Sequence, residues 1–155
     1  MFQKNRAAAE KDGARLEIVT QAVDLALRMR AAGVSRTGYA KMLREVIFFA
    51  WETAEHSKYD PARPRSAAAQ GLPPAELDYD HAIPMKIVID LALKAGPDAD
   101  AVEGVLREKV HAVLITKEEH ARLRDLKLGN EMPVDWDGID WRARYRAAGI
   151  TLPEM

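Results

Sequence analysis

The first third of the chain carries apolar residues at helical spacing. In residues 16–29 they recur at intervals of three and four up to a glycine, which predicts an amphipathic helix that ends there. A second apolar face covers residues 39–51, and either Ser35 or Thr37 can cap its helix. The short link between the two patterns predicts an antiparallel helical hairpin over residues 14–56.

Residues 57–75 have a different composition. Several prolines and a glycine interrupt this stretch, and few large apolar residues occur in it, which indicates a long surface loop. Loops of this length in a compact domain are usually functional or mobile.

Two short segments have the features of β-strands. Within residues 76–83, Leu77, Tyr79 and His81 alternate with two aspartates, and residues 110–115 are rich in β-branched side chains. The segment between them predicts two helices, because each of its two apolar helical patterns begins near a proline. Thr116 and Glu119 have the spacing of a capping box, which predicts a helix directly after the second strand.

These patterns together predict a mostly helical α+β fold. At 155 residues the chain is expected to form a single domain over residues 1–155. In this domain the helical hairpin and the loop precede a two-stranded β element, which is followed by a helix within residues 76–127. A tryptophan-containing tail with a last helix completes the chain over residues 128–155.

The net charge and the cysteine content of the chain exclude several classes of function. The chain has 23 basic and 24 acidic residues and a formal net charge of −1, which speaks against a protein whose whole surface coats nucleic acid. It has no cysteine, so disulfides, thiol catalysis and cysteine-based metal sites are excluded. Any metal ion would have to be held by carboxylate and imidazole groups.

Two short motifs carry residues suited to hydrolytic chemistry. Asp80 and His81 end the first predicted strand, and a proline soon follows them. The second predicted strand leads into a capped helix that carries Glu118 and His120. Residues 76–127 therefore resemble the HNH nucleases of the His-Me finger class. In that family an Asp-His or Glu-His pair ends one strand, and a helix after the next strand supplies a second histidine.

The resemblance implies metal-dependent hydrolysis of phosphodiester bonds in DNA or RNA. His81 would be the general base, since a neutral imidazole with a pKa near ~6.5 accepts a proton from water at neutral pH. Asp80 and His120 would bind a divalent ion, Mg²⁺, Mn²⁺ or Zn²⁺, with Glu118 as a further ligand. The chain departs from the family in having two predicted helices between the strands and no matching asparagine to orient the base. Each histidine can also be an ordinary structural residue.

Basic side chains offer candidate contacts to nucleic acid. Arg63 and Arg65 lie in the predicted loop, and Lys86 follows the first strand. Such groups can bind phosphates and add salt-dependent affinity. They can equally belong to a solvated surface.

The tail supports an alternative function. Trp136 and Trp141 lie close together beside arginines, a composition typical of hot spots in protein interfaces. The alternative is a non-catalytic protein-binding module, such as a small inhibitor or adaptor, including one built on a degenerate nuclease scaffold. The two tryptophans can also anchor the tail on the helical core.

The expected localisation depends on two features, a signal peptide at the N-terminus and an apolar stretch long enough to span a membrane. Residues 1–6 run into a short alanine run and then charged residues, without the apolar core of a signal peptide. The most apolar stretches are shorter than the ~20 residues that a membrane span requires. We therefore expect a cytoplasmic protein with no membrane partner, and the oligomeric state is left open.

Overall fold

The computed structural model describes the backbone of residues 2–154 and the side chains of residues 10–154. Six α-helices and one two-stranded antiparallel sheet are found in this part of the chain, which confirms the mostly helical α+β prediction. The chain divides into two compact units. The first contains the chain up to Glu55 together with Ile89–Arg107, and the second contains His56–Val88 together with the chain from Glu108 onward.

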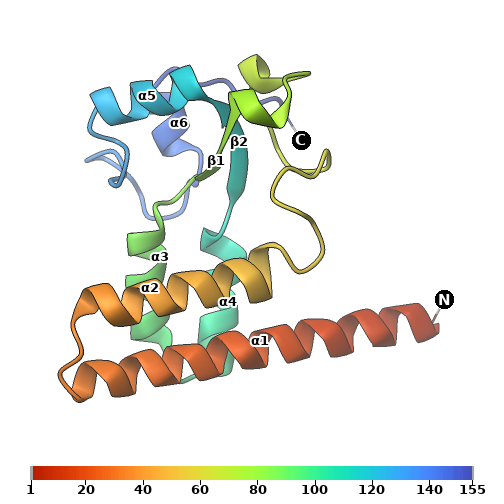
Figure 1. The fold of residues 1–155 in the computed structure, drawn as a ribbon, viewed down its shortest axis with the longest axis vertical. Coiled ribbons are helices and arrows are strands. Elements are labelled where there is room, and N and C mark those ends of the chain that lie inside the picture. The colour runs from red at the N-terminus through yellow and green to blue at the C-terminus, as the bar shows by residue number, and fades with distance from the viewer. Residues whose placement is uncertain (1, 155) are drawn as a thin grey trace. The chain divides into compact units, whose positions relative to one another are not determined.

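The first unit contains the predicted helical hairpin. Helix α1 (Phe2–Ala31) begins earlier than its apolar pattern, and α2 (Arg36–Val46) packs against it (Figure 1). Gly33 has a φ of +86° between the two helices, a conformation that glycine adopts without steric cost. The end of α2 continues into a π-helical segment, η1 (Ile47–Glu52).

In the first unit, the backbone at Gly96 lies very close to a side chain of α1. This glycine follows α3 (Met85–Ala95) and precedes α4 (Ala99–Lys109). A Cβ atom on Gly96 would lie 2.3 Å from Cγ1 of Val23 in α1. No other residue type fits here without movement, because non-bonded carbon atoms normally stay about 3.5–4.0 Å apart.

The second unit is built on the small sheet. Strand β1 (Leu77–His81) pairs with β2 (Ala112–Thr116) in antiparallel register, so that Asp80 lies opposite Val113 and His81 opposite Ala112. Helix α5 (Lys117–Asp125) follows β2 directly and contacts both strands (Figure 1). The unit also contains the short helices η2 (Ala67–Ala69), η3 (Pro74–Glu76) and α6 (Ala143–Ala147).

Side chains of the sheet point alternately to two faces. Val113 and Ile115 pack with Leu123 of α5 and Tyr145 of α6 in one hydrophobic cluster. Leu114 and Leu77 pack with Ala69 of η2 in the other cluster. The sheet therefore has the helices α5 and α6 on one side and the 57–75 segment on the other.

The predicted capping box of α5 is present. Thr116 Oγ1 accepts a hydrogen bond from the Glu119 backbone N–H, and the Glu119 carboxylate accepts one from the Thr116 N–H. The junction that places the side chains of α5 over the sheet is thereby fixed.

Within the part of the chain that the structure describes, none of the helices combines the length and apolar character needed to span a bilayer.

Candidate functional site

The two sequence motifs lie in the second unit, on the strands β1 and β2 and on the helix α5 that follows them. Asp80 and His81 end β1, β2 lies beside it, and α5 carries Glu118 and His120 across the pair. Along the chain the elements follow in the order β1, α3, α4, β2 and α5.

Asp80 is a buried residue bound by two side chains of the tail. Its Oδ2 accepts hydrogen bonds from the Arg144 guanidinium and from the Tyr145 hydroxyl, the latter at 2.6 Å. Burial raises the pKa of Asp80 above its usual range, although Arg144 and Tyr145 favour its charged form. Burial and the adjacent Asp80 charge also raise the pKa of Tyr145 well above its usual value. Tyr145 therefore remains a hydrogen-bond donor to Asp80 at neutral pH.

Arg144 is the centre of this network, and no sequence pattern singled it out. Its side chain is 1% exposed and donates to the backbone carbonyls of Ala82, His81 and Leu128 at 3.2, 2.7 and 2.7 Å, besides Asp80. The guanidinium thus joins the end of β1 to the segment after α5. In the sequence it is one of three alternating arginines, and only its burial distinguishes it.

His120 is held by a carboxylate of β1. Its Nδ1 lies 2.8 Å from Asp78 Oδ2, and Lys117 Nζ lies 3.2 Å from Asp78 Oδ1. Partial burial disfavours the charged form of Asp78, but the hydrogen bonds from His120 and Lys117 outweigh it and lower the pKa of this carboxyl. Asp78, which lies outside the predicted set of site residues, is therefore the direct partner of His120.

The two glutamates at the start of α5 differ in environment. Glu119 is buried and accepts hydrogen bonds from Ser66 Oγ at 2.6 Å and from the Thr116 N–H at 2.9 Å. Glu118, the predicted additional ligand, is exposed to solvent.

His81 lies on the opposite face of β1 from Asp80 and Asp78, because successive side chains of a strand alternate. Its ring contacts Tyr79 edge-on, with ring centroids 5.4 Å apart. A positive charge on His81 or on His120 would favour the ionised form of Asp80. The side chains of these three predicted residues are nevertheless divided between the two faces of the sheet.

Two of the predicted metal ligands already have protein partners in this arrangement. Asp80 Oδ2 is bound by Arg144 and Tyr145, and His120 Nδ1 is bound by Asp78. Among residues 10–154, no group of three or more histidine, aspartate and glutamate side chains is arranged to hold a metal. No catalytic step through a metal ion follows from this geometry.

Two cations lie near Tyr79, which points to the same face of β1 as His81. The Lys58 ammonium lies 5.8 Å and the Arg63 guanidinium carbon 5.1 Å from the centre of its ring. We call Lys58, Arg63, Tyr79 and His81 the Tyr79 surface. Two basic residues of the loop and two aromatic rings of β1, one of them a predicted site residue, are brought together here.

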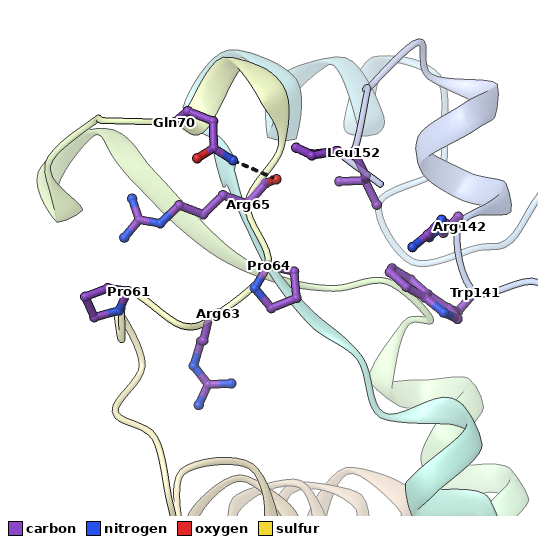
Figure 2. Close-up of a pocket in the computed structure, with 9 residues that line it drawn as sticks. Pro61, Arg63, Pro64, Arg65, Gln70, Trp141, Arg142 and Leu152 are labelled. Carbon is purple, nitrogen blue, oxygen red and sulfur yellow. Dashed lines mark hydrogen bonds between the residues drawn. The ribbon is translucent and has the colours of Figure 1, made fainter. Parts of the chain in front are cut away.

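The other predicted basic contacts have different surroundings. Arg65 lines a pocket with Arg63, and Figure 2 shows Trp141 and Arg142 on the other side of it. Lys86, in the first turn of α3, forms an exposed ion pair with Glu131 and does not line this pocket.

Both predicted partner-binding tryptophans make contacts within the unit. Trp141 stacks on His111 with ring centroids 4.7 Å apart and packs against the cluster of Val113 and Tyr145. Trp136 Nε1 donates to the Asp140 carbonyl at 2.9 Å. These contacts support the interpretation in which the tryptophans anchor the tail, and they leave the partner prediction untested.

No family model, curated protein sequence or solved structure matches the chain.

Proposed function

We propose that the second unit is a nucleic-acid-binding module that contacts the sugar-phosphate backbone and bases through the Tyr79 surface. The observation that carries the proposal is that two cations, Lys58 and Arg63, lie close to the Tyr79 ring, which also contacts the His81 ring. Proteins that bind single-stranded nucleic acid combine basic side chains along the backbone with aromatic rings on which bases stack. The near-zero net charge of the chain is compatible with a local site of this kind.

The Asp80 network supports a binding role on a scaffold that resembles a nuclease. A divalent ion at Asp80 would have to compete with the Arg144 guanidinium, which is fixed by four backbone carbonyls. Arg144 already supplies the positive charge that this carboxylate needs. The proposed function therefore assigns Asp80 to the stability of the unit.

A second candidate function is cleavage of the bound strand with His81 as general base. One observation favours it: His81 belongs to the same surface as Tyr79, Lys58 and Arg63. A strand bound there would bring phosphodiester groups toward an imidazole, the side chain that most often transfers protons at neutral pH. The metal ion implied by the resemblance has no part in this candidate.

Binding is tested by fluorescence anisotropy with labelled single-stranded DNA, single-stranded RNA and duplex DNA at several salt concentrations. We expect the single strands to bind more tightly, with an affinity that falls as salt rises. Lys58→Glu should weaken binding and reduce the salt dependence, by a slope of about 0.7 for each phosphate of a single strand that the variant no longer neutralises. Lys41→Glu, the same charge change at an exposed lysine of α2, is the matched control. Equal affinities of the two variants would contradict the proposal.

Cleavage is tested on the same oligonucleotides with and without Mg²⁺, Mn²⁺ and Zn²⁺. Products formed by the wild type and not by His81→Ala would establish the second candidate. Products formed equally by both proteins, or by neither, would exclude His81 as a general base and leave the binding result to stand alone.

A further inference from the structure

We propose that the pocket beside the Tyr79 surface is a binding site for the terminal phosphate of a nucleic-acid strand. This inference rests on the proposed function and specifies which part of the ligand enters the pocket. The pocket lies entirely within the second unit. Its walls come from the loop and the tail: Pro61, Arg63, Pro64, Arg65, Gln70, Trp141, Arg142, Leu152 and Pro153.

The positive charge of the pocket favours the binding of an anion. Three of its lining residues, Arg63, Arg65 and Arg142, are arginines, and none of the lining residues is acidic. Arginine is the side chain best suited to phosphate because its planar fork presents several N–H donors at once. The pocket thus concentrates positive charge in a chain whose net charge is −1.

Arg142, a lining residue of this pocket, has a donor without a partner. Its Nε is buried and has no hydrogen-bond partner, although buried N–H groups are nearly always paired. The guanidinium carbon lies 4.8 Å from the centre of the Trp141 ring, and Trp141 is in turn stacked on His111. Ring stacking holds the arginine in position, so little side-chain freedom would be lost when an anion binds.

The other two arginines are fixed by backbone carbonyls. Arg63 donates from Nε to Ser57 and from Nη2 to His56, both at 2.8 Å, and Arg65 donates from Nη1 to Leu72 at 3.3 Å. These bonds position the charges and leave Arg142 as the arginine of this pocket with an unpaired buried donor. Figure 2 shows Arg63 and Arg142 on opposite sides of Pro64, with the Arg63 side chain extending away from Arg142.

Arg63 connects the pocket with the Tyr79 surface. Its guanidinium contacts the Tyr79 ring, and the same residue lines the pocket. A strand whose base stacks near Tyr79 would therefore continue toward Arg142. The surface and the pocket form one path along which the backbone of a single strand can run.

The size of the pocket suits a small chemical group. Its volume is about 180 Å³, below the ~300–1,000 Å³ of sites that enclose a whole small molecule. A single phosphate group with part of its sugar is the portion of a nucleic acid suited to such a volume. A terminal phosphate monoester carries a charge of about −1.5 to −2 at pH 7, more than the single charge of an internal diester, and so gains more from three arginines.

The test compares oligonucleotides of one sequence that carry a 5′-phosphate, a 3′-phosphate or hydroxyl groups at both ends. We expect the wild type to bind one phosphorylated form at least fivefold more tightly than the unphosphorylated form. Arg142→Gln should abolish this difference. Arg124→Gln, at an exposed arginine of α5 outside the pocket, should retain it.

A second variant guards against an effect on folding. Arg65→Gln alters the opposite wall of the pocket and should reduce the same difference, with the thermal unfolding of both variants measured alongside. Inorganic phosphate should compete with the phosphorylated strand on the wild type and not on Arg142→Gln. Equal binding of all three oligonucleotides by the wild type would overturn the terminal-phosphate site and leave the proposed function intact. Absence of binding to any of them would overturn both.

Discussion

The Arg144 guanidinium donates a hydrogen bond to the Asp80 carboxylate inside the second unit, and both side chains are buried. A charge left alone at such a site carries a large desolvation penalty, so removal of one partner from a buried pair typically costs about 3–5 kcal/mol. The pair joins α6 to β1. It is therefore central to the stability of the strand that carries Tyr79 and His81.

Removal of either partner should destabilise the protein strongly. Arg144→Met leaves Asp80 without its cation, and we expect the free energy of unfolding to fall by about 3–5 kcal/mol. Chemical denaturation at pH 7 measures the change. Arg146→Met, at an exposed arginine two positions further on whose partner Asp140 is also on the surface, should change it by less than about 1 kcal/mol. Similar losses in the two variants would contradict the structural role of Arg144.

The pH dependence of stability should report the contact between Asp78 and His120. The pKa of Asp78 is lowered in the folded protein, so the folded state favours the ionised carboxyl more than the unfolded state does. This contribution is fully present above the unfolded pKa of about 3.8–3.9 and is lost as the pH falls through the lower folded pKa. Asp78→Asn should therefore be less stable than the wild type at pH 6, and the difference should shrink below pH 4.

Asp125→Asn is the control for that measurement, because Asp125 is an exposed residue at the end of α5. We expect its stability difference from the wild type to be small at both pH values. A difference between Asp78→Asn and the wild type that grows on acidification would show that the sign of the Asp78 contribution is wrong.

The α-helices α2 and α5 are each preceded by a hydroxyl residue, and the two caps should respond differently to alanine. Thr116→Ala removes a side chain that accepts from the Glu119 N–H, and we expect a loss of about 0.5–2 kcal/mol. Ser35 occupies the N-cap of α2 without a side-chain cap bond, so Ser35→Ala should change stability by no more than about 0.5 kcal/mol. Thermal and urea unfolding compare the variants, and equal losses would refute the assignment of the capping box.

Alanine substitutions at two glycines of the first unit should have opposite effects on stability. Gly96→Ala places a Cβ 2.3 Å from Val23 Cγ1, and such overpacking typically costs about 1–3 kcal/mol. Gly104 lies inside α4 with nothing within 4 Å of its added Cβ, so Gly104→Ala should raise stability by up to about 1 kcal/mol. Opposite signs in the unfolding free energy are expected, and a loss in both variants would contradict the contact at Gly96.

Local patterns predicted most of the elements because the interactions that form them are local. The apolar spacing before Gly33, the alternation over residues 77–81 and the spacing of Thr116 and Glu119 each depend on residues close in sequence. The extension of α1 toward Phe2 was missed because that segment has no continuous apolar stripe. The π-helical turns of η1 give no distinct pattern in a run of apolar residues.

The surroundings of the candidate site depend on contacts between distant parts of the chain, which no local pattern encodes. Asp80 meets Arg144 and Tyr145 from the tail, and Tyr79 meets Lys58 and Arg63 from the loop. Asp80 was predicted as a ligand because it directly precedes His81. The alternation of the strand could have indicated that these two side chains point to opposite faces.

The insertion between β1 and β2 has a consequence for synthesis on the ribosome. β1 pairs with a strand that lies about thirty residues further along the chain, and at a translation rate of about 5–20 residues per second its partner appears about two to six seconds later. Until then the backbone groups of β1 have no strand to bind, which leaves an edge open to pairing with other chains. The alternating aspartates of β1, Asp78 and Asp80, give the unpaired strand a negative charge. The repulsion between like charges opposes pairing between the β1 strands of two chains that are still being synthesised.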